Sequence, residues 1–252
     1  MKMKTSINIK SQEELAILRE AGKILSVIVN ELRSSLKIGM TTRAVDELAE
    51  KLIEGHHVKP AFKGYRGFPG CVCISLNQEV VHGIPSERFL KKGDIVSLDV
   101  GIIHRNFYAD MAISAGIGEI SQEARRLIEI TRESLMKGIE QARENNRLSD
   151  ISNAIQKFVE TSNFSVVRDF VGHGIGRMLH EEPEIPNFGD PHQGPILKEG
   201  MVFAIEPMVN AGSWQIKILE DGWTVVTQDG KPSAHFEHTI AITKYGPEIL
   251  TK

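Results

Sequence analysis

Apolar residues recur at helical spacing in four parts of the chain. The first stretch opens with Ser11 and carries Glu14 three positions later, which is typical of a capping box at a helix N-terminus. An apolar stripe at helical spacing follows, beginning with Leu15 and Leu18. The stretch that begins at Ser121 repeats the same Ser-Gln-Glu opening. The predicted helices cover residues 11–35, 39–54, 121–142 and 147–160.

Strand-like runs of apolar and β-branched residues follow each pair of predicted helices. Residues 94–117 predict two paired strands, and 201–209, 223–228 and 236–243 predict further strands. Runs of helices are thus segregated from runs of strands. This order favours an α+β fold in which helices cover one face of a curved antiparallel sheet.

The two halves of the chain resemble each other. The segment LKKGDIVSLDV (90–100) matches LKEGMVFAIEP (197–207), which places Asp99 on Glu206. Both halves also carry HGI, at 82–84 and 173–175. We therefore predict one domain, residues 1–252, with two pseudo-symmetric halves at about 11–118 and 120–245.

Composition excludes several classes of function. The net charge of −3 over 252 residues does not favour nucleic-acid binding. No apolar run reaches the length of a signal peptide or a membrane span. The two cysteines, Cys71 and Cys73, are too close in sequence for a good disulfide, which favours a reduced, cytoplasmic protein. We expect a structural role for Cys71.

Four acids lie in apolar strand segments, two in each half of the repeat. They are Asp99, Asp110, Glu206 and Glu237. If the halves pack about a pseudo-twofold axis, these acids converge, and four like charges repel unless cations neutralise them. Two divalent ions would do so and would form a two-metal hydrolytic site.

The segment VGHGIGRMLH supplies two histidines for such a site. His173 is the expected imidazole ligand, and His180 would face the substrate. Oxygen-rich ligation with one imidazole suits Mn, Fe, Co or Zn. We expect the glycines beside His173 to let the backbone approach the metals. A phosphate-binding loop is disfavoured because the glycine spacing fits neither nucleotide pattern.

Taken together, these segments resemble a known family. SLDVG, YADMA, GHGIGRMLHEEP, AIEPM and HFEHT resemble the bacterial, type I methionine aminopeptidases, and the resemblance extends over nearly the whole chain. It implies the pita-bread fold. The segments CISLNQEVVHGIP and LEDGWTVVT are similar to the methionine enzymes in particular.

The resemblance also implies site residues. Two metal ions would be held by Asp99, Asp110, His173, Glu206 and Glu237. The catalytic residues would be His82, His180 and Glu206. The substrate would be bound by Phe62, Tyr65, Phe68, Cys73, His82, Leu179, His180 and Trp223. Many bacterial members have Phe where this chain has Leu179, which changes the shape of the pocket.

We therefore expect an aminopeptidase that removes the initiator methionine when the second residue is small. Glu206 would shuttle a proton, His180 would stabilise the substrate carbonyl oxygen, and His82 would contact the scissile amide nitrogen. Two alternatives remain, an Xaa-Pro aminopeptidase or prolidase and a non-catalytic binding module. The resemblance further implies a cytoplasmic monomer that acts on nascent chains at the ribosome.

Overall fold

The computed structural model describes residues 6–252, and the four predicted helices are confirmed. They are α1 (Gln12–Ser35), α2 (Thr42–Gly55), α3 (Gln122–Gln141) and α4 (Leu148–Thr161). The capping box forms at α1, where the Ser11 side chain accepts a hydrogen bond from the Glu14 backbone amide. Helix α2 begins later than predicted because Thr41 caps it through the Ala44 amide.

One nine-stranded antiparallel sheet forms the centre of the molecule. Its main path runs β1-β4-β5-β14-β9-β7-β8, with β2 added to β4 and β15 added to β14. The strands are β1 (Lys59–Pro60), β2 (Val72–Leu76), β4 (Ile95–His104), β5 (Phe107–Gly116), β7 (Gly172–Gly174), β8 (Glu181–Ile185), β9 (Val202–Ile205), β14 (Glu237–Thr243) and β15 (Gly246–Ile249).

Two smaller sheets adjoin this one. The first has the order β13-β10-β6 and the second β11-β12-β3. Their strands are β3 (Glu79–Val81), β6 (Ser165–Val166), β10 (Met208–Asn210), β11 (Ile216–Ile218), β12 (Val225–Thr227) and β13 (Ser233–His235).

The strand predicted at 201–209 is two strands in different sheets. Strand β9 ends at Ile205, and β10 begins at Met208 in a separate sheet. Glu206 and Pro207 lie between them, and proline has no amide hydrogen with which to continue a ladder. This interruption leaves Glu206 at the strand end.

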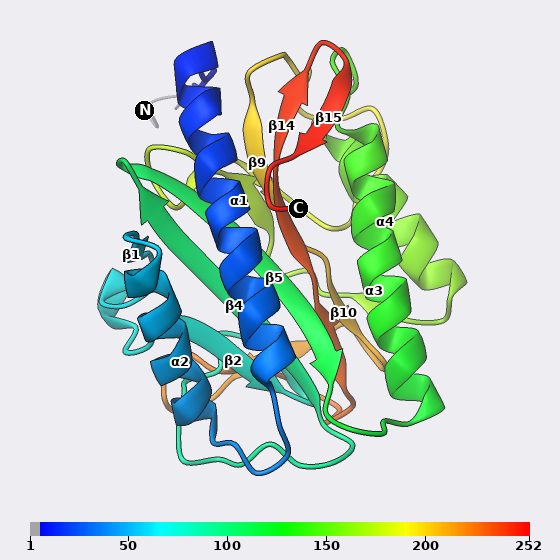
Figure 1. The fold of residues 1–252 in the computed structure, drawn as a ribbon. Coiled ribbons are helices and arrows are strands. Elements are labelled where there is room, and N and C mark those ends of the chain that lie inside the picture. The colour runs from blue at the N-terminus through cyan, green and yellow to red at the C-terminus, as the bar shows by residue number, and fades with distance from the viewer. Residues whose placement is uncertain (1–5) are drawn as a thin grey trace.

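The helices cover one face of the central sheet, as Figure 1 shows for α1 to α4. Alternate residues of β4, such as Leu98 and Val100, are buried in a cluster with residues of α1 and α2. In the other half, Phe203 of β9 and Ile240 of β14 are buried with residues of α3 and α4. The intervening residues of each strand point to the opposite face.

The two predicted halves meet in the middle of the sheet. Strand β5 pairs with β14 through Ala112 and Glu237, and Ala112 also pairs with Asp99 of β4. Each half thus contributes two helices and adjacent strands to one sheet, so the predicted α+β class is confirmed. That residues 1–252 form a single domain remains our proposal.

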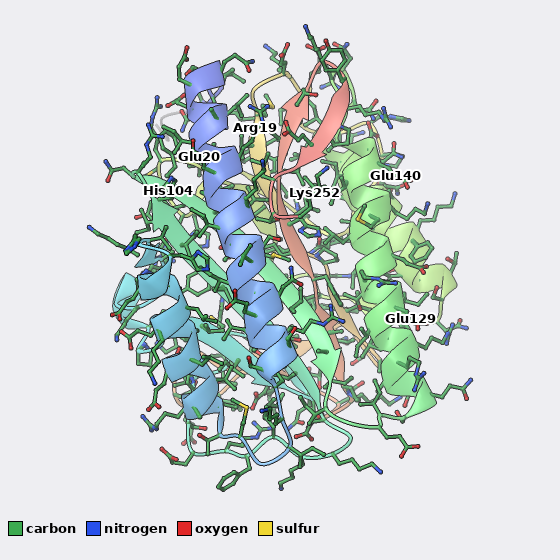
Figure 2. The ribbon with its side chains drawn as sticks, viewed as in Figure 1. Arg19, Glu20, His104, Glu129, Glu140 and Lys252 are labelled. Atoms are coloured by element: carbon green, nitrogen blue, oxygen red, sulfur yellow. The ribbon has the colours of Figure 1, made fainter. Side chains whose placement is uncertain are left out.

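Ion pairs attach α1 to the edges of the sheet. Figure 2 shows Arg19 and Glu20 on α1 and His104 at the end of β4. Glu20 Oε2 lies 3.1 Å from His104 Nε2, and Arg19 donates two 2.8 Å hydrogen bonds to Glu248. Within residues 6–252, no helix is both long enough and apolar enough to span a membrane.

Candidate metal centre

Five consecutive strands of the central sheet each bring one predicted metal ligand to the face away from the helices. Along the path β4-β5-β14-β9-β7, Glu237 begins β14 and Glu206 follows the last residue of β9. The complete order is Asp99, Asp110, Glu237, Glu206 and His173. For the four acids the strand alternation explains the convergence, because a sequence neighbour of each one is buried in the clusters that pack against the helices.

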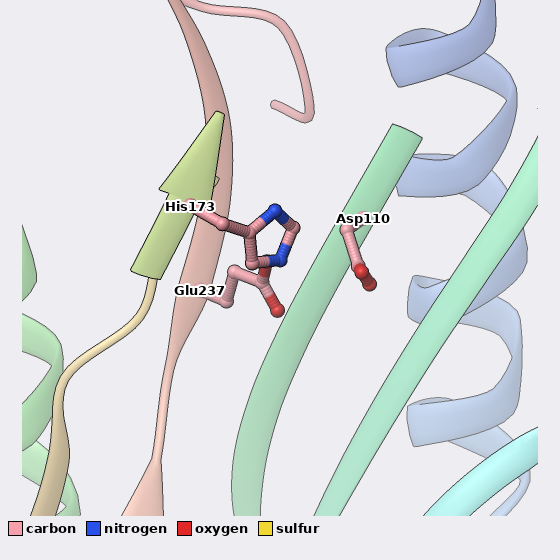
Figure 3. Close-up of side chains that lie close together, drawn as sticks. All are labelled: Asp110, His173 and Glu237. Atoms are coloured by element: carbon pink, nitrogen blue, oxygen red, sulfur yellow. The ribbon is translucent and has the colours of Figure 1, made fainter. Parts of the chain in front are cut away.

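Three of these side chains come within metal-binding distance of one another. Ligand atoms of Asp110, His173 and Glu237 all lie within 4.8 Å of one another, and Figure 3 shows the three groups converging. Glu206 extends the group, with its Oε1 3.5 Å from His173 Nε2. Asp99 lies beside Asp110, with which its side chain shares a hydrogen bond.

Burial opposes the charge of all four carboxylates. It raises the pKa of Asp99 to about 7. Burial, together with the charges of neighbouring acids, raises the pKa values of Asp110, Glu206 and Glu237 well above the ordinary range. Positive charge supplied nearby would favour the ionised form of all four groups at neutral pH.

Buried carboxylate oxygens without hydrogen-bond partners indicate that a cation would supply this positive charge. Among residues 6–252, neither Asp99 Oδ1 nor Glu237 Oε1 has a hydrogen-bond partner, although both are buried. Such atoms are costly in a fold unless a cation coordinates them. Burial lowers the pKa of His173 to about 4, so its imidazole is neutral and can bind a metal at pH 7. The donor set therefore fits divalent ions.

The glycines beside His173 have a role beyond the one expected. A Cβ on Gly172 would lie 2.5 Å from the carbonyl oxygen of Ala204. A Cβ on Gly174 would lie 2.2 Å from that of Glu182. The glycines are needed because β7 approaches the backbones of β9 and β8 closely. They thereby allow the pairing that holds His173 in place. The expectation that they also make room for metals stays a prediction.

The two other predicted histidines lie beside the metal ligands. The rings of His173 and His180 are 4.3 Å apart between centroids, so these two residues share one site. His180 Nδ1 lies 2.9 Å from the hydroxyl of Tyr65. His82 has a positive φ of 59°, an uncommon conformation that non-glycine residues adopt mainly at functional sites and tight turns.

A cavity of about 350 Å³ opens next to the ligands. All eight predicted substrate-binding residues line it, and so do all five predicted ligands. The Phe68 and Trp223 rings meet edge to face with centroids 5.2 Å apart, which forms an apolar wall. Cys73 is buried and unpaired in this wall, and Leu179 is buried as well.

The sequence analysis missed several residues of this cavity. Phe170 packs edge to face against His82 at 5.4 Å, but nothing in its sequence context marks it. His235 does not line the cavity, but its Nε2 lies 3.7 Å from Glu206 Oε2. The other missed lining residues are Arg66, Val81, Asp169, Val171, Glu184 and Met208.

Comparisons with known proteins agree with this geometry. The profile of metallopeptidase family M24 matches residues 16–244. Methionine aminopeptidase from Clostridium perfringens is 56% identical over 245 residues, which cover 97% of this chain and 98% of that protein. Methionine aminopeptidase 1 from Bacillus subtilis is 53% identical over 243 residues, which cover 96% of this chain and 98% of that protein.

A solved structure has the same fold over nearly the whole chain. The crystal structure of methionine aminopeptidase from Rickettsia prowazekii matches with a TM-score of 0.97 at 42% identity, covering 98% of this chain and 100% of that one. This match confirms the predicted pita-bread fold. The family profile, the identity over nearly the full length and the cluster of side chains that could hold a metal ion all point to one family. The chain belongs to metallopeptidase family M24.

Proposed function

We propose that this protein is a metal-dependent aminopeptidase that removes the initiator methionine from polypeptides with a small second residue. The observation that carries the proposal is the placement of five ligand side chains, one from each of five adjacent strands, beside a cavity with apolar and aromatic walls. The relatives that match at 53% and 56% identity over nearly their full lengths are named methionine aminopeptidases. A prolidase-type activity is not favoured.

We assign Asp99, Asp110, His173, Glu206 and Glu237 as ligands of two divalent ions. Mn, Fe, Co and Zn all suit oxygen-rich ligation with one imidazole. When bound, divalent ions supply Lewis-acid activation of water and of the scissile carbonyl group. The remaining steps, which are proton transfer and stabilisation of the substrate carbonyl oxygen, depend on side chains that line the cavity.

Glu206 is suited to transfer a proton between the attacking water and the leaving amine. Its side chain is 14% exposed, so it reaches the cavity, and burial raises its pKa, which makes its carboxylate a stronger base. A carboxylate of this kind accepts a proton from the attacking water and delivers it to the leaving amine.

His180 is suited to stabilise the substrate carbonyl oxygen. When its Nδ1 accepts the hydrogen bond from the Tyr65 hydroxyl, its Nε2 carries the hydrogen and can donate it to the substrate. Charge that develops on the carbonyl oxygen then meets a fixed donor. His82, whose pKa burial lowers to about 4, is neutral at pH 7 and contacts the scissile amide.

The aromatic part of the cavity accounts for methionine selectivity. Tyr65, Phe68 and Trp223 surround it together with the buried Cys73 thiol. Sulfur–aromatic contacts are favourable by about 0.3 to 1.5 kcal/mol, and an unbranched thioether fits such a wall without a polar partner. We further propose a cytoplasmic, monomeric enzyme that acts on nascent chains at the ribosome.

Substrate selectivity tests this function. The metal-loaded protein is incubated with Met-Gly-Met-Met, Met-Lys-Met-Met, N-acetylated Met-Gly-Met-Met and an Ala-Pro peptide, and free amino acids are measured. The proposal predicts methionine release from the first peptide only. Efficient cleavage of the Ala-Pro peptide without methionine release would instead establish a prolidase-type enzyme.

A further inference from the structure

The segment that carries His180 has no regular secondary structure of its own. Residues 176–180 connect β7 to β8 as a series of bends, with His180 at their end. Two backbone hydrogen bonds hold the segment at Gly176, which donates to Met178 and accepts from Tyr108. His180 must nevertheless be placed accurately beside His173, so other contacts have to fix the segment.

The carboxylate of Glu181 provides those contacts. Its Oε1 accepts hydrogen bonds from the backbone amides of Arg177 at 2.7 Å and Met178 at 3.2 Å. Its Oε2 accepts from Lys10 Nζ at 2.6 Å and from Asn8 Nδ2 at 3.0 Å. One side chain therefore joins the His180 segment to the N-terminal end of the described chain.

The ion pair at the centre of this arrangement is removed from solvent. The side chains of Lys10 and Glu181 are each 1% exposed. Lys10 is held in place because its backbone amide donates to the Gly200 carbonyl at 2.8 Å, and Ser11, the cap of α1, follows it directly. A buried ion pair contributes little net stability but fixes geometry, because breaking it leaves an uncompensated charge.

Neighbouring residues are fitted to the pair. A Cβ on Gly176 would lie 2.3 Å from Lys10 Cε and 3.2 Å from Glu181 Oε1, so only glycine leaves room for the lysine stem. An ion pair between Arg177 and Glu14 attaches the same segment to the first turn of α1. The packing is specific to this lysine and this carboxylate.

We propose that Lys10 and Glu181 are positioning residues for His180: the buried pair fixes the 176–180 segment so that the imidazole faces the scissile carbonyl. This inference rests on the proposed function of His180. Neither residue touches the substrate. Asn8 and Lys10, which precede α1, thus become part of the active-site framework. They are distant in sequence from the residues that line the cavity.

The main test replaces both partners together. Lys10→Met/Glu181→Met removes the pair without leaving an unpaired buried charge and withdraws the acceptor from the Arg177 and Met178 amides. A displacement of about 1 Å at a catalytic group costs up to about 100-fold in rate, so kcat for Met-Gly-Met-Met should fall about 10- to 100-fold. KM and the number of bound metal ions should stay unchanged, because His180 acts on the transition state and does not ligate metal.

Two further variants complete the test: one that disturbs the segment less, and one that serves as a control. Lys10→Met/Glu181→Gln keeps an oxygen for the two amides and leaves no unpaired buried charge, so its kcat should fall less than that of Lys10→Met/Glu181→Met. Arg19→Met removes the Arg19–Glu248 pair, which attaches the same helix to β15 away from residues 176–180, and it should leave kcat unchanged. If Lys10→Met/Glu181→Met does not fold, Lys10→Met/Glu181→Gln carries the same comparison.

A His180→Ala background separates positioning from general destabilisation. If the pair acts through His180, breaking it in this background has no further effect on kcat, whereas a general effect lowers kcat by the same factor in both backgrounds. Undiminished loss in the His180→Ala background, or normal kcat in Lys10→Met/Glu181→Met, overturns the inference. Activity of the unmodified enzyme is measured first, and its absence would contradict the proposed function instead.

Discussion

Removal of the metal ions should make the free energy of unfolding fall as pH rises from 7 to 8. Chelation leaves four carboxyl groups buried next to one another without a cation. Burial raises the pKa of Asp99 from 3.8 to about 7 and raises those of Asp110, Glu206 and Glu237 well above the ordinary value. The folded protein therefore holds protons that the unfolded chain has already released at pH 7.

The sign of the effect follows from proton linkage. A group with a raised folded pKa contributes stability that is fully present below its unfolded pKa and is lost as pH rises through the folded pKa. For Asp99 the rise from 3.8 to about 7 corresponds to about 4 kcal/mol at 1.36 kcal/mol per pH unit. Each carboxyl that stays protonated in the fold lowers the free energy of unfolding by about 1.4 kcal/mol per pH unit.

The window from pH 7 to 8 isolates the carboxyl groups. Burial lowers the pKa values of His82 and His173 to about 4, so these histidines reduce stability only as pH falls below the ordinary histidine pKa of 6.5. The thiol of Cys71 acts above the ordinary cysteine pKa of 9.0. Between pH 7 and 8, therefore, neither these histidines nor the Cys71 thiol causes the main change in the free energy of unfolding.

Urea unfolding of chelated and Mn-loaded protein, followed by circular dichroism, provides the assay. The chelated protein should lose stability with rising pH, and Glu237→Gln should reduce that slope, because the pKa of Glu237 is raised well above the ordinary value. The Mn-loaded protein should keep or gain stability, because metal binding requires ionised carboxylates. Stability of the chelated protein that is constant or rises from pH 7 to 8 would refute the assignment of four buried acids to one charged cluster.

Three further predictions concern single residues. His82→Ala should lower kcat/KM by about 100-fold through loss of the contact to the scissile amide, and near-normal turnover in a peptide assay would remove His82 from the mechanism. Tyr65→Phe should lower kcat about tenfold, since the lost hydrogen bond to His180 is worth about 1.5 kcal/mol; unchanged kcat would show that the tautomer is fixed otherwise. Gly174→Ala should destabilise the fold by about 3 kcal/mol, because the added methyl group meets a β8 carbonyl oxygen at 2.2 Å, whereas Gly55→Ala, with no atom within 4 Å, should leave the melting temperature nearly unchanged.

The internal repeat explains why the convergence of the four acids in the candidate site could be predicted from the sequence. Matching segments placed Asp99 and Glu206 at equivalent strand positions, and the pairing of β5 with β14 brings the two halves together. Helical periodicity also located α1 to α4 closely, because their apolar stripes are long.

Very short strands, and contacts between residues far apart in the sequence, could not be predicted in this way. Strands of two or three residues, such as β6 and β13, carry no usable period-2 pattern. The contact between Lys10 and Glu181 spans 171 positions, and no local pattern in the sequence encodes it. The glycines beside His173 were visible in the sequence, but their physical reason lies in the approach of neighbouring strands, which only the fold reveals.

Metal-dependent release of methionine tests the central claim most directly. The protein is stripped of metal, and hydrolysis of Met-Gly-Met-Met is measured while Mn, Fe, Co or Zn is added in known equivalents. The account predicts negligible release without metal and release that rises up to about two ions per chain with at least one of these metals. Folded protein that releases no methionine with any of the four metals, or full release in the continued presence of a chelator, would contradict it.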